Sequence, residues 1–362
     1  MDQIWFNLKL LAEFPVVNLA ILVDGIMIGA LFALAAYGLA LVWGVMNVKN
    51  LAQGDFVIAG GYVSWWMAGQ GMNPLLGVPV ALVIMALLGG ALHGTAIHKI
   101  ARANSKLMIG LSIAGFVALM YGVTSGGDLG RSITQWSGLL LAVLLIINGG
   151  IYNLVISRVI ERDLFTSLLT TFGLAIMMAQ IMNLMFGSDT QSVDLGYSTF
   201  SFFDGIVNIP VAKLIGVLMA AALATAVILF MKNSRMGQAI RATAQDPRAA
   251  RVLGIDTERV YAFTFSLNSA ICGAAGAIIV MVWVIQPFYG ITYSVRAFVI
   301  VTAAGLGNLP GVIAAGLGIG AAEQYGSHIF GIGYQQAIAV LLLLIVLVVR
   351  LLQQRRKRQV LQ

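Results

Sequence analysis

The chain has 362 residues, of which 60% are hydrophobic and only 10% are charged, with a formal net charge of +7 at pH 7. This composition excludes a soluble globular domain and predicts an all-α, polytopic membrane protein, because each bilayer crossing needs about 20 apolar residues in a helix. The basic residues gather in short segments, with no basic face lined by aromatic residues, so we expect lipid headgroups and no nucleic acid as a partner.

Long apolar runs predict about nine full membrane spans. The expected ranges are 19–46, 51–69, 74–97, 107–124, 137–157, 165–187, 209–231, 260–285 and 334–350. Asp24 is interpreted as a solvent-exposed carboxylate at the outer end of the first span. The helices should form one transmembrane domain over residues 1–350, followed by a basic tail over residues 351–362.

The distribution of Lys and Arg between the loops predicts the orientation of the chain. Basic residues gather in 99–106, 158–162, 232–259 and 350–358, whereas 125–136 carries one Arg and 188–208 carries none. Because cytoplasmic loops are enriched in Lys and Arg, we expect the basic loops and the C-terminus in the cytoplasm. The N-terminus then falls outside.

A tenth apolar run, residues 297–322, is interrupted at its middle by the sequence Gly-Leu-Gly-Asn-Leu-Pro-Gly at 305–311. One continuous span would place the basic tail on the wrong side, so we expect a broken or re-entrant pair of about 12 residues each, near 297–328. Non-helical backbone inside a membrane needs protein or water around it, which favours a solute path. A proline kink inside a packed bundle remains the alternative.

The polar segment 232–259 carries six Lys or Arg and three Asp or Glu, and it contains more helix signals than a connector needs. Ser234 is a predicted N-cap of a helix that runs to about Gln245. Asp246 and Pro247 then predict the start of a second short helix, which ends at Gly254. A cytoplasmic surface of defined shape usually contacts another protein, whereas a solvated loop that only sets topology is the simpler alternative.

Polar side chains within apolar runs are costly unless they are used, so they are candidates for a solute path. The candidates are Asn47, Asn50, Gln53, Asp55, Thr170, Thr171, Asn268 and Glu323. Hydrogen bonding between helices is the competing explanation for each of them. His93 and His98 lie five residues apart, which is not the spacing of paired metal ligands on a helix, so no metal site is expected.

Small residues four apart predict close helix contacts at Gly25 and Gly29, at Gly273 and Ala277, and at Gly316 and Gly320. This pattern indicates a tightly packed helical bundle and does not identify a substrate.

Four runs in this order resemble the permease subunits of branched-chain amino acid ABC importers. They are residues 25–62, the Thr-Thr-Phe-Gly-Leu-Ala run at 170–175, the Ala-Ile-Arg-Ala-Thr-Ala-Gln-Asp-Pro run that opens 239–256, and the Gly-Leu-Gly-Asn-Leu-Pro-Gly run that opens 305–316. The chain departs from the family at 50–55, where Asn-Leu-Ala-Gln-Gly-Asp replaces the common Asn-Phe-Ala-His-Gly-Glu/Asp. A second departure is an apparent two-span insertion at about 85–136.

The resemblance implies a multi-pass permease of a bacterial inner membrane. Its expected partners are cytoplasmic ATPase subunits, a second permease subunit, either identical or related, and a periplasmic solute-binding protein. The expected ATPase-coupling residues are Arg241, Asp246, Arg248, Arg251 and Gly254. The chain lacks a Gly-x-x-x-x-Gly-Lys-Ser/Thr loop, so we expect neither an enzyme nor a bound cofactor.

Other transport functions remain open at this point. A urea or short-chain amide permease would belong to the same class of importer. An ion-gradient-driven secondary transporter should instead show a chain of intramembrane carboxylates or an inverted repeat, and only Asp55 and Glu323 are available.

Overall fold

The computed structural model describes residues 2–93, 164–203, 205–305 and 307–359. In this part of the chain the secondary structure is helical apart from one two-stranded hairpin, which confirms the predicted all-α fold class. The helices are α1 (Asp2–Glu13), α2 (Pro15–Met46), α3 (Gln53–Gly69), α4 (Gly77–His93), α8 (Leu164–Phe186), α9 (Val211–Asn233), α10 (Arg235–Gln245), α11 (Pro247–Val252), α12 (Thr257–Ile279), α13 (Gly290–Ala304), α14 (Leu309–Phe330) and α15 (Gln335–Gln359), with short 3-10 turns at Pro74–Leu76, Pro287–Tyr289 and Ile332–Tyr334. Strands β1 (Thr199–Phe202) and β2 (Val207–Pro210) pair antiparallel.

Among the described helices, α2, α9 and α12 are long and apolar enough to cross a membrane. A fourth candidate is the bent pair Pro287–Ala304 and Leu309–Phe330, whose two parts meet at 120°. The apolar stretches in α4, α8 and α15 are shorter. The predicted number of nine spans is therefore not established, and the predicted spans 107–124 and 137–157 lie outside the described residues, as does most of the apparent insertion.

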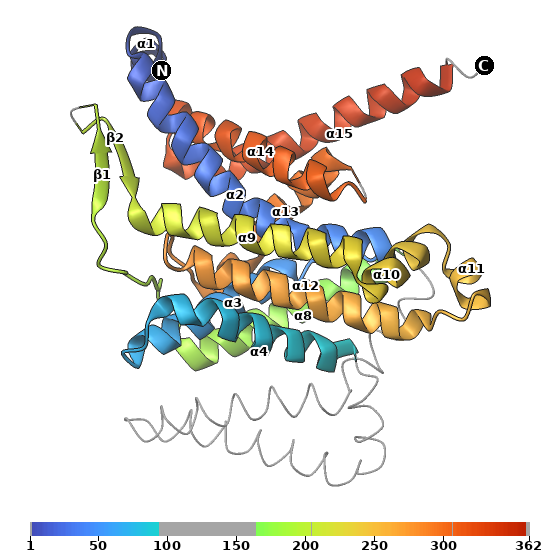
Figure 1. The fold of residues 1–362 in the computed structure, drawn as a ribbon. Coiled ribbons are helices and arrows are strands. Elements are labelled where there is room, and N and C mark those ends of the chain that lie inside the picture. The colour runs from blue at the N-terminus through green and yellow to red at the C-terminus, as the bar shows by residue number, and fades with distance from the viewer. Residues whose placement is uncertain (1, 94–163, 204, 306, 360–362) are drawn as a thin grey trace.

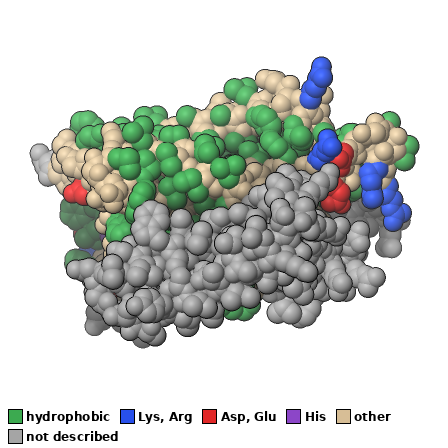
Figure 2. Space-filling view, turned by 90° about the horizontal axis from the view of Figure 1, so that it is seen from below, with side chains coloured by type: hydrophobic (Ala, Val, Ile, Leu, Met, Phe, Trp, Pro, Cys, Tyr) green, Lys and Arg blue, Asp and Glu red, His purple; other side chains and the backbone are tan. Residues whose placement is uncertain are grey.

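The long helices lie side by side, and the ends of the molecule differ in character (Figure 1). Helix α1 and the β1–β2 hairpin lie at one end, whereas α10, α11 and the last turns of α15 lie at the opposite end. Figure 2 shows hydrophobic side chains spread along the side of the molecule, with Lys, Arg and acidic side chains gathered mainly at the α10–α11 end. This distribution is the one expected of a protein surrounded by hydrocarbon along its middle.

Helix α12 lies at the centre of the bundle, where it packs against α2, α3 and α4. Most of its residues from Asn268 to Ile279 are fully buried. Glycines allow this packing, because a side chain at Gly60 would strike the backbone of Gly273, and one at Gly276 would strike the backbone of Val57.

The predicted small-residue motifs of α2 and α14 pack against each other. A Cβ atom at Gly25 would lie 2.7 Å from the Cα of Ala321, and one at Gly29 would strike the backbone of Gly316. The prediction that helices approach closely at these residues is thus confirmed, and the two motifs prove to be partners in one contact.

The predicted break in the late apolar run is confirmed, but the lengths of its two parts were wrong. Helix α13 ends at Ala304, and Gly305 and Gly307 have φ of 92° and 78°, which glycine adopts without strain. Helix α14 then has 22 residues rather than about 12.

Candidate functional site

Residues 47–52 form a corner between α2 and α3, in which Asn47 is exposed and residues 48–52 are buried or half-buried. Helix α2 ends at Asn47, which adopts a left-handed conformation with φ of 53°. The chain then returns to the interior, where Nε2 of Gln53 donates a hydrogen bond to the carbonyl of Ala35 at 2.8 Å. Ala35 lies about three turns before the end of α2, so α3 begins deep within the bundle rather than at its surface.

Two hydroxyl groups satisfy the non-helical backbone of this corner. Oγ1 of Thr171 accepts a hydrogen bond from the amide of Leu51 at 3.1 Å and donates to the carbonyl of Lys49 at 3.2 Å. Oγ of Ser294 accepts from the amide of Gly54 at 2.8 Å and donates to the carbonyl of Leu51 at 2.6 Å. Irregular backbone at membrane depth requires such partners, which explains why these side chains are polar.

A buried amide–thiol cluster lies beside the corner. Nε2 of Gln53 contacts Sγ of Cys272 at 2.6 Å, and this thiol lies 3.4 Å from Oδ1 of Asn268. All three side chains are fully buried. Oε1 of Gln53 and Nδ2 of Asn268 have no hydrogen-bond partner among the described residues. Unsatisfied amide groups are costly in an apolar interior, so the cluster has capacity for a further polar ligand or water.

Asp55 lies in the first turn of α3 and is also buried, with 2% of its surface exposed. Its carboxylate lies against Gly290, where α13 begins, and a Cβ atom at Gly290 would lie 2.6 Å from the Asp55 Cγ. Two helix N-termini therefore meet at this carboxylate.

Glu323 forms a buried ion pair with Arg296, a residue that the sequence analysis missed. Nε of Arg296 lies 3.1 Å from Oε2 of Glu323, and only 6% and 2% of the two residues are exposed. The Arg296 guanidinium also lies 4.6 Å from the centre of the Phe32 ring. A single Arg inside an apolar helix needs a buried acidic partner. This requirement is the signal from which the Arg296–Glu323 pair could have been predicted.

The structure buries six of the eight predicted pathway residues, together with Ser294 and Arg296. We call this group the central polar layer: Asn50, Gln53, Asp55, Thr171, Asn268, Ser294, Arg296 and Glu323. Asn47 instead ends α2 and is exposed. Thr170 lies in α8, but the position of its side chain is outside the description.

The segment 232–259 has the predicted helix–corner–helix form. Oγ of Ser234 accepts from the amide of Gly237 at 2.8 Å and so caps α10. Oδ1 of Asp246 caps α11, accepting from the amides of Arg248 and Ala249 at 2.7 and 3.1 Å. Gly254 has φ of 84°, which explains the glycine after the second helix.

This segment has a face that holds it to the bundle and a face that is exposed. Ile240 is buried, and the Arg241 guanidinium donates to the carbonyl of Met231 at the end of α9. At the far end of α11, Val252 and Leu253 are 87% and 79% exposed. Arg248 and Arg251 are exposed beside them, so the segment presents an apolar tip surrounded by positive charge.

We predict that Asp246→Ala will loosen α11 without unfolding the protein. The amides of Ala249 and Arg248 lower the pKa of Asp246, so its capping carboxylate is ionised at neutral pH and is lost only as the pH falls below the usual carboxyl range. Amide hydrogen exchange over residues 248–253 should become several-fold faster in the Ala variant. Asp246→Asn keeps an acceptor oxygen and should lie between Ala and wild type. Equal exchange in all three proteins would contradict the capping role.

The comparisons with known proteins agree with one another. The family model for the branched-chain amino acid transport system permease component matches residues 21–128 and 103–350. The permease protein BraD of Pseudomonas aeruginosa is 26% identical over 323 residues, covering 88% of this chain and 89% of the relative. LivH of Escherichia coli is 26% identical, covering 87% and 88%, and a probable LivH of Methanocaldococcus jannaschii is 27% identical, covering 87% and 84%.

The structure of PsaBC from Streptococcus pneumoniae in complex with Fab aligns over 95% of both chains, but the TM-score of 0.38 at 12% identity is too low to establish a shared fold. The family match, in contrast, extends from α2 into α15 and includes both the central polar layer and the 232–259 segment. The chain therefore belongs to the family of branched-chain amino acid transport system permease components.

Proposed function

We propose that this chain is the transmembrane permease subunit of an ATP-driven importer for branched-chain amino acids, in a bacterial inner membrane. The observation that carries the proposal is the 232–259 segment, two capped helices with an exposed apolar tip at one end of an apolar bundle. Such a surface suits docking of a cytoplasmic ATPase, and Arg241, Asp246, Arg248, Arg251 and Gly254 shape it. The relatives named above are branched-chain amino acid permeases, which supports the substrate class.

The importer needs further subunits. Relatives named LivH and LivM both match this chain, LivM of Salmonella typhimurium at 26% identity over 79% of the chain and 65% of the relative. We propose that the chain pairs with a second permease subunit, identical or LivM-like, and receives solute from a periplasmic binding protein. The C-terminus would then lie in the cytoplasm, since α15 ends at the same end of the molecule as α10 and α11 (Figure 1).

For the solute we propose a path through the central polar layer. The proposed path residues within the layer are Asn50, Gln53, Asp55, Thr171, Asn268 and Glu323, of which Thr171 also supports the corner backbone. Asn47 and Thr170, which lie outside the layer, are proposed to line its approach. Amide and hydroxyl groups can hydrogen-bond the ammonium and carboxylate of an amino acid, while the surrounding aliphatic residues accommodate a branched side chain.

The decisive experiment is affinity purification of the tagged chain from its native membrane, comparing wild type with Val252→Asp/Leu253→Asp. We expect the ATPase to co-purify with wild type and to be reduced at least tenfold in the double variant, because two charges replace the apolar tip. Neither side chain packs against the bundle, so the variant should keep its fold. Purified wild-type complex should then drive uptake of leucine but not of urea.

Leu76→Asp is the matched control, because Leu76 is a 56% exposed leucine in a short turn between α3 and α4. It should retain the ATPase fully. A wild-type chain from which no ATPase co-purifies under mild detergent conditions would contradict the proposed importer and favour a gradient-driven carrier. Uptake of urea in preference to leucine would instead reassign the substrate.

A further inference from the structure

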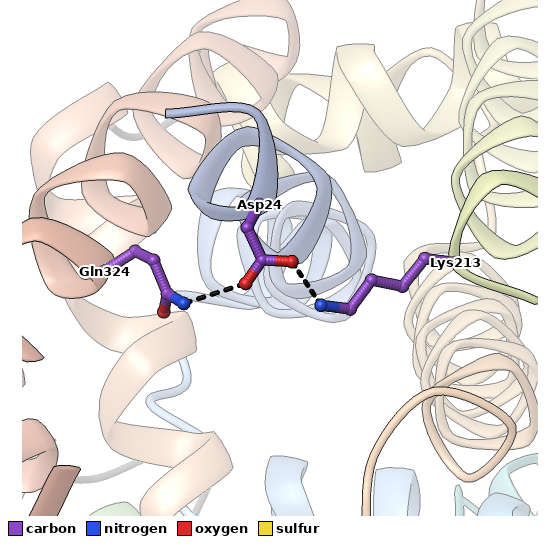
Figure 3. Close-up of polar contacts among 3 residues, drawn as sticks. All are labelled: Asp24, Lys213 and Gln324. Atoms are coloured by element: carbon purple, nitrogen blue, oxygen red, sulfur yellow. Dashed lines mark hydrogen bonds and ion pairs between the residues drawn. The ribbon is translucent and has the colours of Figure 1, made fainter. Parts of the chain in front are cut away.

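Asp24 joins three helices through one carboxylate. It lies in α2, nine residues after the helix begins, so its interpretation as an exposed helix-terminal group was wrong. Nζ of Lys213 in α9 contacts its Oδ1, and Nε2 of Gln324 in α14 donates to its Oδ2 at 2.7 Å (Figure 3). The Asp24 and Lys213 side chains are only 28% and 16% exposed, so this ion pair is less screened than a surface pair.

The contact continues into the central polar layer. Gln324 follows Glu323 in α14, and Glu323 is paired with Arg296 of α13. Adjacent side chains of α14 thus connect to α13 on one side and to α2 and α9 on the other. Of the ion pairs in the described part of the chain, these are the two that connect separate helices, because the others join residues three or four apart.

Helix α9 is attached to the bundle by a narrow contact. Its buried residues form one stripe, which consists of Gly216, Ala220, Ala224, Val227 and Met231. Leu214, Leu218 and Leu229 on its other faces are exposed. Small residues let α9 approach its neighbours closely, and the ion pair of Lys213 adds a directional polar connection to α2.

The two ends of α9 carry different contacts. Lys213 lies in its first turn, whereas Met231, near its last turn, accepts from Arg241 and packs against Gly237 of α10. A helix of 23 residues behaves as a rod of about 35 Å. A displacement of the 232–259 segment would therefore reach Lys213 through α9 itself.

We propose that Asp24 is a positioning residue that couples α9, and hence the ATPase-facing segment, to α14 and the central polar layer. The inference rests on the proposed function, because it assigns the connection between the energy source and the solute path. Asp24 does not touch solute. It holds Lys213 and Gln324 in register, so that movement of α9 displaces α14.

The test measures uptake of leucine and hydrolysis of ATP by the reconstituted importer, with its binding protein, and compares their ratio between variants. Asp24→Asn and Lys213→Met should lower the amount of leucine transported per ATP at least fivefold, with ATPase binding retained. The exchanged pair Asp24→Lys/Lys213→Asp should restore the ratio to within twofold of wild type, because the Gln324 amide can also accept from a lysine. Folding of these variants is checked through Cys272, the one cysteine, which is fully buried and is therefore expected to react only after unfolding.

A covalent cross-link in place of the Asp24–Lys213 ion pair provides a second test. When its thiols are reduced, the Asp24→Cys/Lys213→Cys variant should transport little leucine per ATP hydrolysed. The ratio should recover when a short bis-methanethiosulfonate reagent joins the two thiols. Lys213→Cys alone, treated with the same reagent, is the control and should stay uncoupled. A cross-linked protein that remains uncoupled, or single variants with the wild-type ratio, would overturn this inference alone. Absence of ATP-driven uptake by the wild-type complex would instead overturn the proposed function, and this inference with it.

Discussion

Replacing Glu323 with Leu is expected to lower the free energy of unfolding by about 3–5 kcal/mol. The substitution leaves the Arg296 guanidinium buried at 6% exposure without the carboxylate that lies 3.1 Å from its Nε. The Phe32 ring beneath the guanidinium offers a cation–π contact, which is too weak to replace an ionic partner. Glu323→Gln should show most of the same loss, because it removes the charge and keeps the shape.

The double variant Arg296→Met/Glu323→Leu separates the charge from the packing. Removing both partners also removes the cost of burying them, so this variant should recover most of the stability lost in Glu323→Leu. The measurement is the rate of Cys272 alkylation during denaturant unfolding in detergent, since the fully buried thiol reacts only after opening. A double variant as unstable as the single one would show that packing, and not the ion pair, dominates at this site.

The same double variant distinguishes a role of the Arg296–Glu323 pair in solute transport from a role in holding two helices together. A protein that is stable but transports no leucine would place Arg296 and Glu323 among the groups that the solute requires. A stable and active protein would limit the pair to holding α13 and α14 together. The sequence leaves these two explanations open, because both predict a polar residue inside an apolar helix.

The parts of the structure that the sequence predicts well depend on local signals. Ser234, the Asp246-Pro247 pair and Gly254 each act within a few residues of their own position, and the caps and turn they predict are present. The glycine motifs likewise predict close helix contacts, although only the structure shows that α2 and α14 contact each other through them.

The predictions that were wrong or incomplete concern contacts between distant residues. The apolar pattern does not reveal that residues 48–52 return to the interior, so the need of this backbone for Thr171 and Ser294 could not be foreseen. Asp24 was misread because α2 begins before its apolar core and because Lys213 and Gln324 are remote in sequence. Arg296 directly precedes the uncharged run 297–322, and its acidic partner Glu323 directly follows that run, so the pattern of uncharged residues contains neither member of the pair.

A second large effect is expected at the contact between α2 and α14. Gly320→Val should reduce the yield of folded protein severely, because a Cβ atom at Gly320 would lie 2.5 Å from the carbonyl oxygen of Gly25 and 2.6 Å from the amide nitrogen of Gly29. Overpacking costs about 1–3 kcal/mol even where side chains can adjust, and here the obstacles are backbone atoms. The helices would have to separate.

Gly318→Val is the matched control, because Gly318 lies in the same helix and has nothing within 4 Å of its Cβ position. This variant should unfold, by Cys272 alkylation, close to the wild-type midpoint. Equal stability of the two variants would contradict the close approach of α2 and α14.

The effect of Gly320→Val extends beyond packing, because the short Gln324 side chain reaches Asp24 only while the glycines hold the two helices together. A partly folded Gly320→Val protein should therefore also lose the coupling that we assign to Asp24.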